Sequence, residues 1–259
     1  MQTSPKTLPT VSLITVTYNA AQNLHSCIGS VRAQDYPHIE HIVIDGASTD
    51  GTQDIVRSYG DAIAHFVSEP DAGLYDAMNK GLARATGDIV GILNADDMYA
   101  HAGVISAVVD AMQRSGADTL FADLVYVSDE RPGEIVRYFP GRGFRPTMMR
   151  RGFMPPHPTY FVRRALYARY GGFDTQFRIC ADFDLMVRHF VVQGVRYHYL
   201  PQVIVHMRTG GSSTQGLRST RTINREMLRS LRQHGVRTHM LLIYSKYINK
   251  IFQLIRKPR

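Results

Sequence analysis

Asp88-Ile-Val-Gly-Ile-Leu-Asn-Ala-Asp-Asp97 is the stretch that decides the fold. Ile89 to Leu93 are apolar or Gly, which is typical of a strand buried on both faces of a parallel sheet. This strand runs directly into Asn94, Asp96 and Asp97, so it ends in a cluster of oxygen ligands. Two adjacent carboxylates repel each other and lose hydration when buried, and a bound cation would offset both effects. The alternative is that the two Asp residues only cap the next helix, since Asp is a favoured N-cap residue.

The residues before this stretch alternate between strand and helix patterns, with a polar loop after each strand. Buried strands are predicted for 11–17, 41–45 and 63–68, and helices for 24–33, 52–59 and 74–85. This alternation predicts an α/β fold with a mostly parallel sheet, flanking helices and right-handed crossovers. Ligands bind beyond the carboxyl ends of such strands. We therefore expect one polar rim made of Thr17, Tyr18, Asn19, Asp45, Asp71, Asn94, Asp96 and Asp97.

The composition of the 259 residues, with 44% hydrophobic and 20% charged residues, is ordinary for a globular protein. Cys27 and Cys180 lie far apart and lack metal-ligand spacing, so neither a disulfide framework nor a zinc site is expected. No apolar run is long enough for a membrane-spanning helix, and residues 1–10 do not resemble a secretion signal. We therefore expect a cytoplasmic protein.

The net charge of +8 is concentrated in residues 217–259, which hold eleven Lys and Arg against a single acidic residue, Glu226. The basic residues recur at helical steps, and apolar residues lie on one side of a second helix expected over 238–255. Such a basic amphipathic tail either contacts an anionic membrane peripherally or packs onto the body or another subunit. The body itself is close to neutral, which argues against nucleic acid as a partner.

The first 97 residues contain four motifs, in this order: VTYN (16–19), VIDGASTDGT (43–52), SEPDAGLYDAMNKGLARATGD (68–88) and LNADD (93–97). In order and spacing they resemble the family 2 inverting glycosyltransferases, which have the GT-A fold. In detail they are similar to the bacterial polysaccharide-assembly subgroup that includes the colanic-acid transferases. The resemblance covers residues 11–216. It implies a Rossmann-like GT-A domain over 1–216, followed by the helical tail 217–259.

The resemblance also implies a nucleotide-sugar donor bound with Mn²⁺ or Mg²⁺. Thr17 and Tyr18 would contact the base and ribose, and Asp45 the uracil or ribose side of the nucleotide. Asp97 would ligate the metal while Asp96 reaches the ribose, although either could be the direct ligand. Further donor-side candidates are Asn19, Asp71 and Asn94. A hard cation that bridges two phosphates needs few protein ligands, because phosphate and water oxygens fill its coordination sphere.

A second motif runs from Gly171 to Arg188 and carries Asp182 at the start of a predicted helix. An Asp at this point is also a good N-cap without any catalytic role. The resemblance implies that Asp182 is the general base, which takes the proton of the acceptor hydroxyl in an inverting transfer. Ala181 stands where the family usually has Glu. Asp184 is expected on the helix surface or in support of the site. The inward face is predicted to be Phe183, Met186, Val187 and Phe190.

The remaining chain gives weaker signals. Strands are predicted for 119–122, 134–139, 157–162 and 201–206. Residues 140–156 form either a basic connector or an acceptor-side loop, and His157 is either an acceptor-side residue or a structural one. Residues 207–214 are either a mobile lid over the nucleotide or a plain connector. Arg208, within this segment, is a candidate for the diphosphate, and His206, just before it, is a candidate for the metal or the diphosphate.

The sequence therefore predicts a metal-dependent inverting glycosyltransferase. It would move a sugar from a nucleotide-diphosphate donor to a hydroxyl of a saccharide acceptor, lipid-linked at the cytoplasmic face of the inner membrane, in bacterial surface polysaccharide or exopolysaccharide synthesis. One alternative is a nucleotidyltransferase, but residues 17–21 lack the Gly-rich loop that such enzymes usually need. The other is a catalytically silent scaffold with a basic anion-binding tail, against which the presence of both Asp97 and Asp182 argues.

Overall fold

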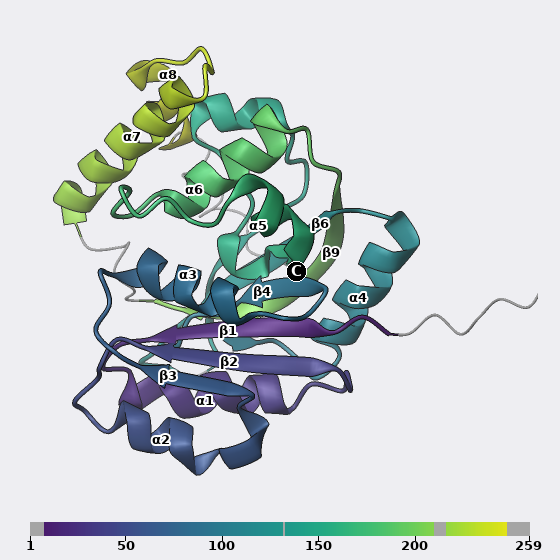
Figure 1. Ribbon diagram of the computed structural model, residues 1–259. Coiled ribbons are helices and arrows are strands. Elements are labelled where there is room, and N and C mark those ends of the chain that lie inside the picture. The colour runs from purple at the N-terminus through teal and green to yellow at the C-terminus, as the bar shows by residue number, and fades with distance from the viewer. Residues whose placement is uncertain (1–7, 132, 210–215, 248–259) are drawn as a thin grey trace, which may run out of the picture.

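The computed structural model describes residues 8–131, 133–209 and 216–247 (Figure 1). Its first part alternates strands with helices, as predicted. The strands are β1 (Val11–Thr17), β2 (Ile39–Asp45), β3 (His65–Ser68) and β4 (Ile89–Ile92). The helices are α1 (Ala21–Arg32), α2 (Thr52–Ser58) and α3 (Leu74–Arg84), with a 3₁₀ turn at Gly60–Ala62. β1 pairs in parallel with β2 and β4, and β2 with β3, so the carboxyl ends of all four strands lie along one edge.

The second part of the chain extends the same sheet with strands of mixed direction. These strands are β5 (Met98–Tyr99), β6 (Thr119–Val127), β7 (Ile135–Phe139), β8 (Phe161–Arg163) and β9 (Tyr197–Arg208). The strand order is β3-β2-β1-β4-β8-β6-β9-β5, with β7 paired to β6. Only β6 and β9 run parallel here, while β8 is antiparallel to both β4 and β6. The predicted α/β class is confirmed, and the predicted strand 134–139 is the antiparallel β7.

The remaining helical segments surround this sheet. They are α4 (Val104–Ser115), α5 (Arg164–Tyr170), α6 (Ala181–Met186) with its π-helical continuation Val187–Val192, α7 (Gly216–Gln233), α8 (Met240–Tyr244) and 3₁₀ helices at Pro146–Arg151 and His157–Thr159. The strand predicted over 157–162 is wrong at its start, because Pro158 has no N–H for a ladder. The Thr159 hydroxyl instead donates to the carbonyl of Ala122, and only Phe161–Arg163 pairs as a strand.

Apolar side chains of β1 point alternately to the two faces of the sheet. Leu13 packs on one face among residues of α1 and α4, and Ile14 packs on the other among residues of α3. β4 is buried throughout, as predicted for the opening stretch. Gly91 of β4 is the register partner of Phe161 in β8. A Cβ at position 91 would lie 2.5 Å from Cε1 of the buried Phe161 ring, so this pairing requires glycine.

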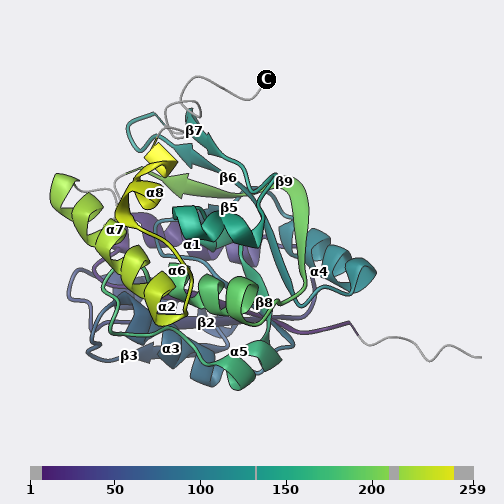
Figure 2. The same ribbon diagram turned by 90° about the horizontal axis from the view of Figure 1, so that it is seen from above.

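The two C-terminal helices pack onto the body, and in both ribbon views α7 runs alongside α6 (Figures 1 and 2). Met227, Leu231 and Ile243 are buried in one cluster with Phe183 and Phe190. For these residues the packing alternative is the correct one. Residues 248–255 of the predicted apolar stripe lie outside the described residues. Among the residues that are described, no helix is long and apolar enough to cross a membrane.

Candidate active site

The predicted polar rim forms where β1, β2 and β4 end side by side. Thr17 and Asp45 are register partners at the ends of β1 and β2. Leu93, which directly follows β4, donates its backbone N–H to Ile14 of β1, and this contact places Asn94 beside the same edge. The prediction that these strands deliver polar residues to one rim is confirmed, because parallel neighbours end on the same side of a sheet.

Two of the predicted donor residues organise the loops at this rim. Asn19 has a left-handed backbone (φ 47°), and its side-chain oxygen accepts the Thr49 N–H at 3.0 Å. Asp45 is fully buried, and it accepts hydrogen bonds from the Ser48 N–H (2.9 Å), the Ser48 hydroxyl and the Ser68 hydroxyl (2.6 Å). Both residues therefore shape the loop 46–51 in this structure. Their contact with a nucleotide stays a prediction.

Tyr18 and Asp71 approach each other over the backbone of Gly46. A Cβ at position 46 would lie 2.6 Å from Asp71 Oδ2 and 3.2 Å from Tyr18 Cδ2. Tyr18 is 68% exposed, and Asp71 uses its other oxygen to accept the Gly73 N–H at 2.8 Å. An aromatic face and a carboxylate oxygen are thus both presented to solvent above Gly46, where a base and a ribose hydroxyl could bind.

Asp97 differs from Asp45 and Asp71, whose carboxylates both accept hydrogen bonds. Its side chain is fully buried, and neither carboxylate oxygen accepts a hydrogen bond of good geometry among the described residues, although the Asn94 side chain and the Arg208 backbone lie close enough to lower its pKa. Burial, reinforced by the charge of Asp96, raises the pKa of Asp97 well above its usual range. Asp96 is partly buried, and burial raises its pKa as well. A buried carboxylate with two unpartnered oxygens, next to a second and partly buried carboxylate, fits a divalent cation, which would replace the missing interactions.

Other polar atoms at the rim are also buried without a partner. Eight such side-chain atoms occur in the described part of the chain, and five of them belong to predicted donor-site residues: Thr17 Oγ1, Asn94 Oδ1, both Asp97 oxygens and Arg208 Nε. Buried polar groups in proteins are normally hydrogen-bonded. A concentration of exceptions at one edge of the sheet indicates a surface that is completed by a ligand.

Arg208 and His206 both lie at the end of β9. The Arg208 guanidinium donates to Asp129 at 3.0 Å and to the Ser26 hydroxyl at 3.4 Å, and its charge lowers the pKa of Asp96 and Asp97 against the effect of burial. His206 is the register partner of Met98, and burial lowers its pKa. No group of three His, Cys, Asp or Glu side chains within the described ranges could hold a metal, so His206 does not join the two carboxylates here. Residues 210–215 of the expected lid lie outside those ranges.

Asp182 lies in the first turn of α6 and contacts residues from distant parts of the chain. Its Oδ1 accepts the Phe183 N–H at 2.7 Å and lies 3.3 Å from the Tyr75 hydroxyl. Burial raises the Asp182 pKa, against the opposing effects of His157 and the Tyr75 hydroxyl. Burial lowers the pKa of His157, whose ring packs edge-on against Phe173. The predicted acceptor-side His157 is therefore brought to the predicted base.

Tyr75 is the site residue that the sequence reasoning missed. It is the second residue of α3, which starts at the carboxyl edge of the sheet, so it brings Asp182 to the same edge as the rim. Its hydroxyl also donates to the Ile179 carbonyl, and its ring stacks on Phe173 with centroids 5.6 Å apart. Its position inside the motif 68–88 could have marked Tyr75 as a candidate. Its contact with Asp182 could not be predicted, because the two residues are 107 positions apart in the sequence.

The N-cap of α6 is Cys180, so the alternative that Asp182 is the capping residue is wrong. The inward face of the helix is as predicted, because Phe183, Met186, Val187 and Phe190 are all buried. The surface position expected for Asp184 is wrong, since this residue is only 2% exposed. It is buried because α7 covers it, an arrangement that the local pattern around position 184 does not encode.

A mixed α/β sheet with a carboxylate pair at its carboxyl edge, and a third carboxylate held at that edge by a neighbouring helix, is the arrangement expected of a sugar transferase of the GT-A type. The sequence pattern of the family described as "Glycosyl transferase family 2" matches residues 12–171, and the chain belongs to this family. The colanic-acid subgroup stays a prediction.

Curated relatives carry glycosyltransferase names. An uncharacterised glycosyltransferase of Mycobacterium tuberculosis is 35% identical over 189 residues, covering 71% of this chain and 70% of the relative. A PGL/p-HBAD biosynthesis glycosyltransferase of Mycobacterium bovis is 27% identical and covers 91% of this chain and 90% of its own length. A putative teichuronic acid biosynthesis glycosyltransferase of Bacillus subtilis is 36% identical over 48% of this chain and 50% of the relative.

Solved structures share the fold at lower identity. TarS 1-349 of S. aureus in complex with UDP-GlcNAc superposes with a TM-score of 0.66 at 18% identity, over 86% of this chain and 66% of that one. The mannosyltransferase PcManGT of Pyrobaculum calidifontis, in complex with GDP-Man and Mn²⁺, has a TM-score of 0.64 at 24% identity, over 88% of this chain and 65% of that one. These likenesses establish the GT-A fold, and this chain spans about two thirds of those longer chains.

Proposed function

We propose that this glycosyltransferase is metal-dependent and inverting, and that it moves a sugar from a nucleoside diphosphate to a hydroxyl of a glycan acceptor in cell-surface polysaccharide synthesis. The observation that carries the proposal is the set of unpartnered buried atoms at Thr17, Asn94, Asp97 and Arg208. They combine acceptors, a donor and a hydroxyl, as a ligand with both phosphates and sugar hydroxyls requires.

Each part of the rim has a distinct task in the transfer. Tyr18 and Asp71 would hold the base and ribose above Gly46, and Arg208 would bind the diphosphate. Asp97 would hold a divalent cation together with the donor phosphates, while Asp96 reaches the ribose. Bound there, the cation would supply electrostatic stabilisation of the diphosphate as it leaves.

Asp182 would act as the general base. It would accept the proton of the acceptor hydroxyl while that oxygen forms a bond to the anomeric carbon and the bond from this carbon to the diphosphate oxygen breaks. A single displacement of this kind inverts the anomeric configuration. The pKa of Asp182, raised by burial, makes it a stronger base than an exposed aspartate.

A donor screen tests the proposal directly. Thermal melting would be followed with UDP-, GDP- and dTDP-sugars, each with Mn²⁺, Mg²⁺ or EDTA. A ligand that binds only the folded state raises the melting temperature by mass action, so a cognate donor should register even without an acceptor. We expect the shift to need the metal and to disappear in Asp97→Asn. A shift that is equal in EDTA, or equal in the variant, would contradict the metal assignment.

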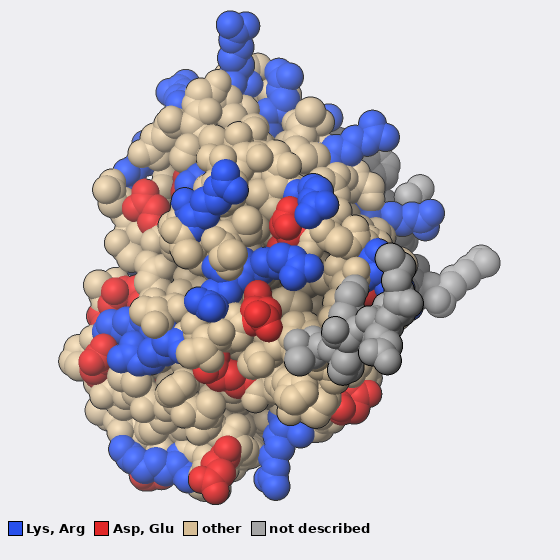
Figure 3. Space-filling model, turned by 45° about the vertical axis from the view of Figure 1, so that its right-hand side comes forward, with Lys and Arg blue, Asp and Glu red and all other residues tan. Residues whose placement is uncertain are grey.

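We further propose that the acceptor is lipid-linked and that the tail meets an anionic membrane at the cytoplasmic face. Leu241 and Tyr244 of α8 are 79% and 43% exposed. Arg151 lies next to them, since its Nε donates to the Ser245 hydroxyl at 3.2 Å. Lys and Arg also predominate over Asp and Glu on the upper part of the face shown in Figure 3. Exposed apolar residues among cations suit an anionic lipid surface.

A flotation assay measures this membrane contact. The full chain should float with vesicles of phosphatidylglycerol and phosphatidylcholine, and less with phosphatidylcholine alone. The double variant Leu241→Ser, Tyr244→Ser should lose flotation but keep donor binding, because both side chains point to solvent. A full chain that stays at the bottom with anionic vesicles would rule out the membrane proposal.

A further inference from the structure

Glu226, the single acidic residue of the tail, forms an unusual set of hydrogen bonds. Its Oε1 accepts the backbone N–H of Arg178 at 3.0 Å, and its Oε2 accepts those of Ile179 and Cys180, both at 2.9 Å. One carboxylate in the middle of α7 thus binds three successive backbone amides of another segment. Hydrogen bonds to an ionised acceptor are the stronger kind, and three of them fix the path of that segment.

The segment bound by Glu226 directly precedes α6. The first N–H groups of a helix have no partner inside it, and the N-cap Cys180 makes no side-chain capping bond. Glu226 therefore caps α6 from outside at Cys180, across 46 residues of sequence, and its other two hydrogen bonds hold the residues just before the helix. The same segment supplies the Ile179 carbonyl that accepts the Tyr75 hydroxyl, and this hydroxyl in turn contacts Asp182.

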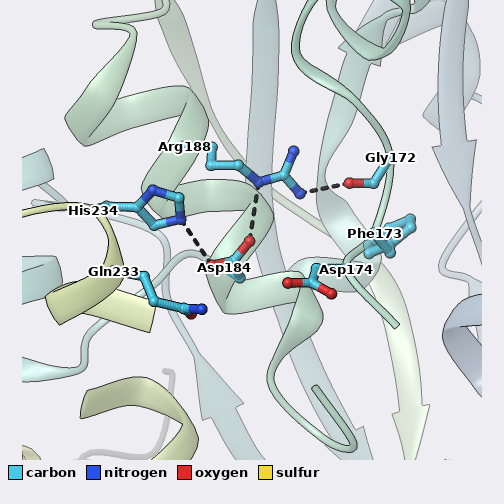
Figure 4. A pocket seen from close by; sticks show the side chains of 7 residues that line it. All are labelled: Gly172, Phe173, Asp174, Asp184, Arg188, Gln233 and His234. Carbon is cyan, nitrogen blue, oxygen red and sulfur yellow. Dashed lines mark hydrogen bonds and ion pairs between the residues drawn. The ribbon is translucent and has the colours of Figure 1, made fainter. Parts of the chain in front are cut away.

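A second attachment holds α6 just beyond Asp182. The buried Asp184 accepts hydrogen bonds from the Ser230 hydroxyl at 2.8 Å and from His234 at 3.0 Å, and it pairs with Arg188 at 3.0 Å. Figure 4 shows this cluster from close by, with the Arg188 guanidinium turned toward the Gly172 carbonyl. Asp184, Arg188 and His234 line a pocket of about 280 Å³, and their polar groups are directed at one another. α7 thus holds α6 on both sides of position 182.

We infer that Glu226 is a positioning residue for the transfer: through the amides of 178–180 it sets where the Asp182 carboxylate points. The inference rests on the proposed role of Asp182 as base. With this role for Glu226, α7 helps to position the catalytic base, in addition to any contact of the tail with a membrane. A displacement of about 1 Å at a reacting group can cost roughly 100-fold in rate.

The test compares Glu226→Gln with two matched variants. Gln keeps the shape of the side chain but replaces one acceptor oxygen with an N–H group, which opposes the amides of 178–180. Glu226→Asp keeps both oxygens and shortens the reach. Arg229→Gln is the control, since Arg229, on the same helix, donates hydrogen bonds to Gln176 and lies over the Phe177 ring, whereas Glu226 binds the amides of 178–180.

We expect Glu226→Gln to lower kcat by roughly 10- to 100-fold with an unchanged KM for the donor. Glu226→Asp should fall between this variant and the wild type, and Arg229→Gln should match the wild type.

The pH dependence of kcat is a second readout. Besides the backbone, the groups that face Asp182 are Tyr75 from α3, His157 from the 3₁₀ turn and the thiol of Cys180. Loosening 178–180 admits water, so the acid limb should move to lower pH as desolvation of Asp182 is relieved.

Wild-type kcat in both Glu226 variants would overturn the inference, and so would equal losses of kcat and melting temperature in Glu226→Gln and Arg229→Gln. Asp182→Asn separates this failure from failure of the proposed base. If Asp182→Asn is inactive while Glu226→Gln is fully active, only the positioning role is wrong. If Asp182→Asn is active, the proposed base itself is wrong.

Discussion

Gly91→Ala tests the packing that holds the opening stretch in the sheet. A Cβ at this position would lie 2.5, 2.9 and 3.1 Å from three atoms of the Phe161 ring. All three distances are inside the contact distance of about 3.5–4.0 Å between carbon atoms. Phe161 has no exposed surface, so its ring cannot swing into solvent to make room. Overpacking of this kind costs about 1–3 kcal/mol of the free energy of unfolding.

Differential scanning fluorimetry and urea denaturation give the measurement. For a domain of this size, 1 kcal/mol corresponds to about 2–4 °C, so the melting temperature should fall by about 2–12 °C. Gly29→Ala is the matched control, because no atom lies within 4 Å of its Cβ position in the interior of α1. Relief of the glycine penalty should raise the stability of that variant by about 0.5–1 kcal/mol. If Gly91→Ala melts at or above the wild-type temperature, the Phe161 ring does leave room for a Cβ at position 91, and the β4–β8 pairing does not require glycine.

Three predictions concern the site. Asp182→Asn should lower kcat by about 10²–10⁴-fold while calorimetry finds the donor affinity unchanged, and an active variant would remove Asp182 from the reaction. Tyr75→Phe keeps the stacking on Phe173 but removes a hydrogen bond that lowers the Asp182 pKa. The pKa of Asp182 should therefore rise in this variant. The acid limb of kcat should then move to higher pH, and an unmoved limb would contradict this contact. Without metal, Asp97→Asn should melt above the wild type by a few degrees, because it relieves the burial and the repulsion by Asp96 that disfavour the Asp97 carboxylate. A lower melting temperature would indicate that Asp97 is structural.

Most of the α/β core was predictable because its signals are local. The run 89–93 is apolar or Gly, and the run 11–17 is rich in apolar and β-branched residues, because both faces of a central parallel strand are covered. The strand predicted over 157–162 failed because a proline and a threonine hydroxyl redirected the backbone hydrogen bonds there. The two-residue β5 had no readable pattern, since its pairing with β9 depends on where a distant strand passes.

The rim of the candidate site was predictable for the same reason, but the state of each side chain was not. Thr17 and Asp45 end their strands, Asn94 and Asp97 come just after β4, and parallel strands end together. That Asp45 is satisfied by Ser48 and Ser68 while Asp97 has no partner depends on the loops folded over each of them.

By itself, the sequence determined the layered α/β core and the edge at which polar residues gather, and it named the candidate carboxylates, because these follow from hydrophobic periodicity and motif spacing along the chain. Only the tertiary structure decided that Tyr75 meets Asp182, that Asp184 is buried and that the tail caps α6 through Glu226. These contacts join segments 46 to 107 residues apart. The spacing of apolar residues predicts which face of a helix or strand is buried. It does not predict which element packs against that face, because this depends on the tertiary arrangement.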